Sequence, residues 1–239
     1  MGAGTTGGSV QDFSTMPFGW GHVDKVTNWF SNADNSNLAE WWGNLSDDER
    51  AWVTRYTGSG YGTINLSQYT EAWEDMSDEM KMRISNLHNA LKTFELNKTI
   101  QVNREADFQI FGSDGMMTVA QVKDFLNQTD GYVQNDGFMS FSTKPNGVHV
   151  DGSGLILHVK FPPSTGAGAY VAPYSQHTNE SEWLSNSNSV FHFDQKKVYE
   201  DYEGIHVYGE WVGQNRAQTI SPTYDKKALT NKRNKGRKK

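Results

Sequence analysis

The chain has no cysteine, little proline and no long apolar run. Its 239 residues include no Cys and six Pro. The lack of Cys excludes disulfides, thiolate nucleophiles and Cys-based metal sites, and it fits a reducing compartment. No apolar stretch approaches the roughly 20 residues that span a bilayer, and residues 1–9 lack the basic and apolar regions of a signal peptide. We therefore expect no membrane span and a cytoplasmic location, in its own cell or in a target cell after delivery.

The composition that remains is polar but suited to folding. Hydrophobic residues make up 36% and aromatic residues 13% of the chain, so it is not typical of a disordered protein. Residues 226–239 hold eight of the 22 Lys and Arg and no acid, and such a tail could bind nucleic acid or an acidic surface, or only aid solubility. We expect a flexible Gly/Asn-rich arm at 1–36, a folded domain at 37–222 and a disordered basic tail at 223–239.

Local signals predict helices in the first half of the chain. Ser46 and Glu49 form a capping-box pattern that begins a helix, and we expect it to end at Thr57-Gly58. An amphipathic helix begins near Ser77, and a third is capped by Thr118.

From about residue 131 the pattern changes to short strands between turns. Helices followed by strands favour the α+β class over a parallel α/β sheet. The last two strands predict a hairpin around residues 196–204. The expected strands are Gly137–Thr143, Leu155–Phe161, Ala169–Ala172, Val190–Asp194 and Ile205–Val212.

Two patterns argue against common kinds of site. His192 and His206 fall on adjacent predicted strands, but no carboxylate accompanies them at a recognisable interval, so no metal site is expected. Residues 58–62, Gly-Ser-Gly-Tyr-Gly, follow a helix where a dinucleotide-binding loop follows a strand, and they lack the Lys-Ser/Thr of a P-loop. We interpret them as a helix stop and turn.

One acidic pair could carry chemistry. Glu180 and Glu182 are two residues apart, which in an extended backbone places both carboxylates on one side, roughly 6.5–7 Å apart. Such a pair can stabilise an oxocarbenium-like centre with one carboxylate and take a proton with the other. The same spacing also occurs on solvated strands without function.

Four ordered blocks around this pair resemble a known enzyme family. Residues 161–184, with residues 190–193, resemble the C-terminal half of the Arg/Ser-Thr-Ser/Glu-x-Glu class of ADP-ribosyltransferases. That class includes binary toxins, vertebrate ectoenzymes and bacteriophage enzymes. Ser140-Phe141-Ser142 is similar to its Ser-Thr-Ser strand, with Phe in the middle. Residues 101–104 resemble its first-strand Arg motif, with Asn103 as a departure, and residues 55–65 resemble the Tyr-Thr-Gly…Ile-Asn stretch of toxin-like members.

The resemblance implies a fold and a reaction. The fold would be two packed β-sheets around an NAD cleft, with helices from the N-terminal part. The reaction would be transfer of ADP-ribose from NAD⁺, a substrate, to a protein side chain, without a metal. In the resembling families, Glu at the first position of Glu-x-Glu goes with arginine targets, and Gln there goes with asparagine or glutamine targets. This sequence has Glu180 at that position, so the implied acceptor is arginine.

The resemblance also implies residue roles. Arg104 would hold the NAD⁺ phosphates or nicotinamide ribose, and Ser140 would orient Glu182, with support from Ser142 in NAD binding. Glu182 would bind the ribose 2′-OH and stabilise the cationic ribose, and Glu180 would orient and deprotonate the acceptor. The segment around Tyr174 and His177 would contact the target.

Several alternatives remain open at this point. The same residues would suit an NAD⁺ glycohydrolase with water as acceptor. The departures at Asn103 and Phe141 would suit an inactive structural or binding module, such as a phage head-associated protein, and the basic tail would suit ADP-ribosylation of nucleic acid. Arg104 could instead form a surface ion pair with Glu105 or Asp107.

Overall fold

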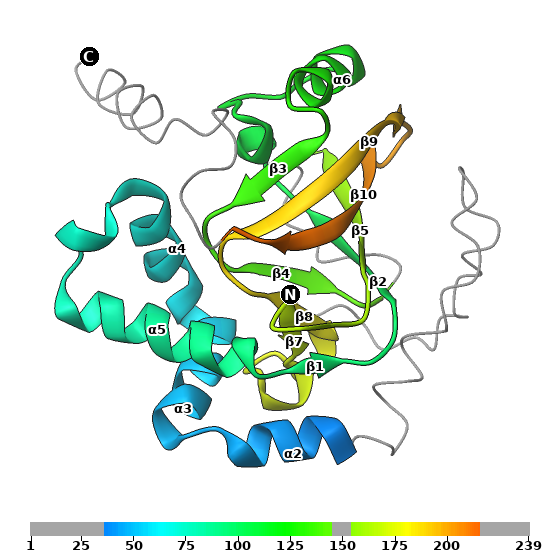
Figure 1. Cartoon of the computed structure of the whole chain (residues 1–239). Helices are drawn as coiled ribbons and strands as arrows, with labels where there is room; N and C mark the ends of the chain where they lie inside the picture. The colour runs from blue at the N-terminus through cyan, green and yellow to red at the C-terminus, as the bar shows by residue number, and fades with distance from the viewer. Residues whose placement is uncertain (1–35, 145–153, 216–239) are drawn as a thin grey trace.

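A computed structural model describes residues 36–144 and 154–215 of the chain. The predicted tail at 223–239, and the predicted arm apart from its last residue, lie outside the described residues. Helices come first and strands later, which confirms the α+β prediction (Figure 1). In the described part of the chain, no helix is long and apolar enough to cross a membrane.

Three predicted helix starts are confirmed by their caps. Ser46 and Thr118 each form a complete capping box, and the Ser77 hydroxyl accepts the backbone N–H of Met80. A further helix, α2, was not expected, and it packs through Trp41, whose indole N–H donates to the Ala90 carbonyl at 2.9 Å. The α-helices are α2 Ser36–Asn44, α3 Asp47–Arg55, α4 Tyr61–Thr70, α5 Asp78–Lys92 and α6 Val119–Gln128.

The helix stop expected at Thr57-Gly58 is wrong. The chain passes from α3 through a π-helical turn, Tyr56–Gly60, directly into α4. None of Gly58, Gly60 and Gly62 has a positive φ, the conformation with which glycine ends a helix. Close packing explains the glycines at positions 58 and 60. A Cβ on Gly58 would overlap the Gln176 side chain, and a Cβ on Gly60 would lie 2.9 Å from the Arg55 carbonyl oxygen.

Eight strands form one hydrogen-bonded sheet in the order β3-β9-β10-β5-β2-β4-β8-β7, and β1 pairs with β6 separately. Strands β2 and β4 share one register pair, Asn103 with Ser142. This narrow junction divides the sheet into halves of five and three strands, which correspond to the two sheets that were expected. The strands are β1 Glu95–Leu96, β2 Ile100–Glu105, β3 Tyr132–Asn135, β4 Met139–Ser142, β5 Leu155–Phe161, β6 Ser164–Thr165, β7 Gly168–Tyr170, β8 Glu182–Ser185, β9 Ser189–Glu200 and β10 Ile205–Gln214.

Two strand boundaries differ from the predictions. Strand β9 continues to Glu200, so the hairpin to β10 turns at residues 201–204 and not from Lys196 onward. Strand β7 ends at Tyr170, because Ala172–Tyr174 forms a three-ten turn with Pro173 at its start. Figure 1 shows β9 and β10 as long neighbouring strands, with α6 beyond the β9 and β3 edge.

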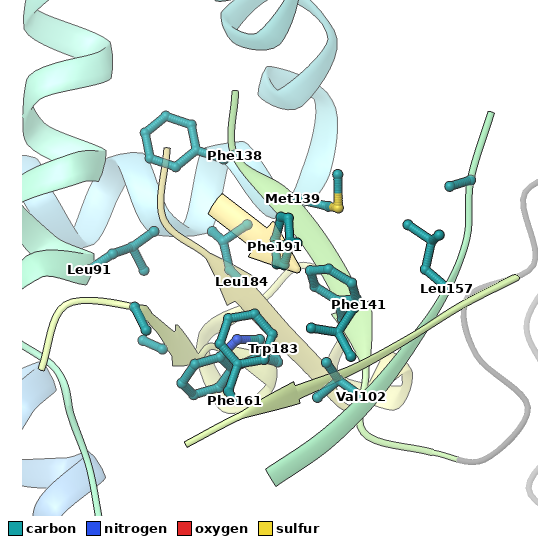
Figure 2. Packing of buried hydrophobic residues seen from close by; sticks show 14 of the residues in the cluster. Leu91, Val102, Phe138, Met139, Phe141, Leu157, Phe161, Trp183, Leu184 and Phe191 are labelled. Carbon is teal, nitrogen blue, oxygen red and sulfur yellow. The ribbon is translucent and has the colours of Figure 1, made fainter. Parts of the chain in front are cut away.

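The core determines which face of β4 and β8 stays polar. Phe141 pairs with Trp183 across the two strands, and both side chains are fully buried. Their rings lie 5.7 Å and 5.3 Å from the ring of Phe161 (Figure 2). Since side chains alternate along a strand, Ser140, Ser142 and Glu182 point to the opposite face.

The glycines of the π-helical turn give a first prediction. We expect Gly60→Ala to destabilise the chain by about 1–3 kcal/mol, because its Cβ would press on the Arg55 backbone. Gly62→Ala is the matched control: nothing lies within 4 Å of its Cβ, so we expect a gain of about 0.5–1 kcal/mol. Urea denaturation measures both, and equal effects would contradict the packing explanation.

Candidate active site

The site is built on the polar face of β4 and β8. The Ser140 hydroxyl donates a hydrogen bond of 2.5 Å to Glu182 Oε1. Ser140 lies on β4 and Glu182 is the first residue of β8, so the pairing of the two strands fixes this contact.

The residues after Ser140 hold the segment that carries the two acids. The Ser142 hydroxyl donates to the Glu180 carbonyl at 3.1 Å and accepts the Lys144 N–H at 3.1 Å. The Thr143 backbone N–H and hydroxyl both donate to the Ser181 carbonyl at 3.0 Å. Ser142 is 1% exposed, and its observed hydrogen bonds hold the backbone at Glu180 and Lys144 in position. A contact between Ser142 and NAD stays a prediction.

The extended Glu-x-Glu geometry expected from the sequence is wrong. Glu180 ends a three-ten turn, Thr178–Glu180, and Ser181 adopts the left-handed conformation with φ 52° and ψ 49°. Strand β8 begins only at Glu182. The two acids remain close enough for the charge of Glu180 to raise the pKa of Glu182.

The environment of Glu182 favours its neutral form. Its side chain is 3% exposed, and burial raises its pKa to about 7. The hydrogen bond from Ser140 and the positive charge of Arg104 act in the opposite direction. Ser175 also lies near enough to lower the pKa, although its hydroxyl does not complete a hydrogen bond to Oε2. Oε2 is therefore a buried acceptor without a donor among the described residues.

Arg104 approaches this carboxylate from β2. Its Nη1 donates to the Ser140 carbonyl at 2.7 Å, and the side chain is half-buried. No ion pair joins Arg104 to another residue within 36–144 and 154–215, so the alternative pairing with Glu105 or Asp107 is not observed. The guanidinium keeps further N–H donors for an anionic ligand.

The helical half fixes the start of β4. The Asn65 side chain exchanges two hydrogen bonds of 3.1 Å with the N–H and carbonyl of Phe138, and the Tyr56 hydroxyl donates to the same carbonyl at 3.1 Å. Both side chains come from the block at residues 55–65. The sequence identified that block only by resemblance and assigned these two residues no role.

The two residues expected to contact a target lie in different surroundings. Tyr174 stacks on Trp42 of α2, with ring centroids 3.8 Å apart and planes 2° from parallel. His177 is exposed, and its backbone N–H donates to the Ser175 hydroxyl at 2.9 Å. Tyr174 is thus held by the helical layer, whereas the His177 side chain faces solvent.

This fold and arrangement of residues define a class of protein. The ADP-ribosyltransferase exoenzyme family model matches residues 31–218. The chain belongs to this family. No curated protein matches the chain in sequence.

Solved structures of bacterial toxins share the fold. Plx2a, an ADP-ribosyltransferase toxin from Paenibacillus larvae, is 20% identical with a TM-score of 0.64 over 80% of this chain and 96% of its own. The ADP-ribosylating toxin BECa of C. perfringens, solved with NADH, is 22% identical with a TM-score of 0.65, over 79% of this chain and 48% of its own. An exoenzyme from Clostridium limosum is 17% identical with a TM-score of 0.61, over 80% of this chain and 95% of its own.

The raised pKa of Glu182 predicts a pH-dependent stability difference. Its value moves from 4.5 in the unfolded chain to about 7 in the folded one, so ionisation costs folding free energy as pH rises through that interval. We expect Glu182→Gln to be more stable than the wild type above pH 7, by at most about 3 kcal/mol. Below pH 4.5 the advantage should vanish.

Urea denaturation at pH 4.5, 6 and 8 measures this difference. Glu40→Gln, at an exposed position of α2, controls for the change of charge and should show no such trend. A stability difference for Glu182→Gln that does not vary with pH would contradict the assigned environment.

Proposed function

We propose that the chain transfers ADP-ribose from NAD⁺ to an arginine side chain of a protein and releases nicotinamide. The observation that carries this proposal is the state of Glu182. One carboxylate oxygen is held by Ser140, and the other is buried without a donor among the described residues. A ribose hydroxyl of NAD⁺ would supply the missing donor.

The residues around Glu182 suit the rest of the dinucleotide. A planar guanidinium binds phosphate oxygens through two parallel hydrogen bonds, and Arg104 has donors left for this purpose. It lies on the strand next to β4, and its charge acts on Glu182. Arg104 would bind the phosphates or the nicotinamide ribose while Glu182 binds the 2′-OH.

The reaction follows from the charge that develops on the ribose. The bond between ribose C1′ and the nicotinamide nitrogen breaks, and its electron pair leaves with neutral nicotinamide. The ribose becomes an oxocarbenium-like cation, which the Glu182 carboxylate stabilises only in the transition state. A guanidinium nitrogen of the acceptor then forms the new bond to C1′ and loses a proton.

Glu180 would receive that proton and orient the acceptor. Arginine is protonated at neutral pH, so attack by its nitrogen requires a nearby base or carboxylate. Glu180 is half-buried, and no side chain in the described ranges bonds its carboxylate. His177, which is exposed on the same segment, would contact the target, with Tyr174 beside it.

Substitution of Glu180 separates transfer from hydrolysis. We expect Glu180→Gln to lower transfer to an arginine acceptor by at least about 100-fold, within the range for loss of a catalytic base, and to leave slow release of nicotinamide to water. Glu182→Gln should abolish both reactions. Release of nicotinamide from NAD⁺, with agmatine or lysate protein as acceptor, measures the two reactions.

The same assay decides between the rival functions. Normal transfer by Glu180→Gln would contradict its role, and nicotinamide release by the wild type that no acceptor accelerates would identify a glycohydrolase. No nicotinamide release under any condition would indicate an inactive binding module. Mass spectrometry of labelled products would show whether the acceptor is arginine, another residue or nucleic acid.

Arg104 should act on binding more than on chemistry. We expect Arg104→Lys to raise the KM for NAD⁺ about tenfold, because lysine is a point charge that cannot form the two-bond contact with phosphate. The kcat should change less. Arg55→Lys, at an exposed position, serves as the control, and an unchanged KM in Arg104→Lys would contradict the phosphate contact.

A further inference from the structure

A chain of buried polar side chains begins beside Arg104 and leaves the site. Asn103, the departure from the family motif, is fully buried on β2, and its Nδ2 donates to the Lys144 carbonyl at 3.1 Å. A carbonyl can only accept, so this contact orients the amide. Asn103 Oδ1 therefore faces His158 Nδ1, which lies 2.6 Å away.

The chain continues through two stacked imidazoles. His158 Nε2 lies 2.9 Å from His206 Nδ1, and each residue is 4% exposed. With one N–H on each ring, His158 donates from Nδ1 to Asn103 Oδ1. Its Nε2 then accepts from His206 Nδ1.

This order of donors leaves two acceptors facing each other. If His206 uses its proton on Nδ1, its Nε2 carries a lone pair, and that atom lies 2.9 Å from Asp201 Oδ1. Reversal of the Asn103 amide would only move the conflict to the Lys144 carbonyl. A cation therefore completes this row of hydrogen bonds, either a second proton on His206, which would form an ion pair with Asp201, or a bound metal ion.

We propose that this cation is a divalent transition-metal ion of the Zn²⁺ type, bound by His206 Nε2 and the carboxylates of Asp201 and Glu203. One ligand atom from each of the three residues lies within 4.8 Å of the others. Imidazole nitrogen and carboxylate oxygen are ordinary zinc ligands, and three of them leave a position for water. His158 would fix the orientation of the liganding ring by accepting its other N–H.

The fold brings two carboxylates close to His206, which the sequence analysis did not predict. No metal was expected, because no carboxylate was recognised near His206. The hairpin turn at 201–204 is shorter than predicted, and it brings Asp201 and Glu203 of the β9–β10 turn back to His206 on β10. Asp201-x-Glu203-x-x-His206 is the pattern that would have indicated the site.

The proposed ion would stabilise the sheet and take no part in the chemistry. It would tie the β9–β10 turn, through His206 and His158, to Asn103, whose register partner Ser142 joins the two halves of the sheet. Binding to the folded chain alone raises its melting temperature with ion concentration. The site can thus be tested without NAD⁺ or an acceptor.

The test is a titration of the EDTA-treated full chain with Zn²⁺, followed by calorimetry and thermal denaturation. We expect one saturable site and a rise in Tm with Zn²⁺, and much weaker binding of Mg²⁺, which prefers oxygen ligands. Asp201→Asn and Glu203→Gln lie in the exposed turn, so both should fold, and each should weaken Zn²⁺ binding at least about tenfold. Glu200→Gln, an exposed neighbour, should bind as the wild type does.

Three results would overturn the proposal. One is no saturable Zn²⁺ binding by the wild type, and another is equal weakening by Glu200→Gln and Glu203→Gln. The third comes from ¹⁵N NMR of the imidazoles: a proton on both nitrogens of His206 in the presence of Zn²⁺ would show that the cation is a proton. Loss of that Nε2 proton on addition of Zn²⁺ supports the metal.

Discussion

The hydrogen bond from Ser140 to Glu182 is the contact on which the rest of the site depends. It holds a carboxylate in a buried position where ionisation is costly, and it occupies one oxygen so that the other remains without a donor among the described residues. The alternation of β4 and β8, with Phe141 and Trp183 in the core, gives the contact its direction. The fold holds the Glu182 side chain in place, whereas the negative charge of its carboxylate is destabilising in this buried position. Such a carboxylate is suited to stabilise a short-lived positive charge.

The structure holds this contact from three sides. Asn65 and Tyr56 fix the backbone at Phe138, where β4 begins, and Ser142 and Thr143 fix the segment that leads to Glu182. Arg104 reaches the Ser140 carbonyl across the one register pair that joins the two halves of the sheet. The motif departure at Asn103 lies at this junction and begins the buried polar chain, while the other departure, Phe141, fills the core.

Features set by neighbours in the sequence could be predicted, and those set by distant contacts could not. The caps at Ser46 and Thr118 depend on residues three positions apart, so they were recognised. The left-handed Ser181 depends on bonds from Thr143, and the glycines at 58 and 60 depend on packing against Gln176 and the Arg55 backbone. The site residues could therefore be predicted from the family resemblance. The backbone geometry at Glu180 and the proximity of Asp201 and Glu203 to His206 could not.

The central claim is that the reaction depends on the ionised form of a buried Glu182, and the pH dependence of nicotinamide release from NAD⁺ tests it most directly. We predict that kcat/KM rises with pH, with a midpoint near the pKa of Glu182, which burial, as the largest cause, raises to about 7. In Ser140→Ala the midpoint should move to higher pH. The hydrogen bond from Ser140 stabilises the charged form of Glu182, so its loss raises the pKa of that carboxyl. A profile that is flat from about pH 5 to 9, or a midpoint that Ser140→Ala leaves in place, would contradict the central claim.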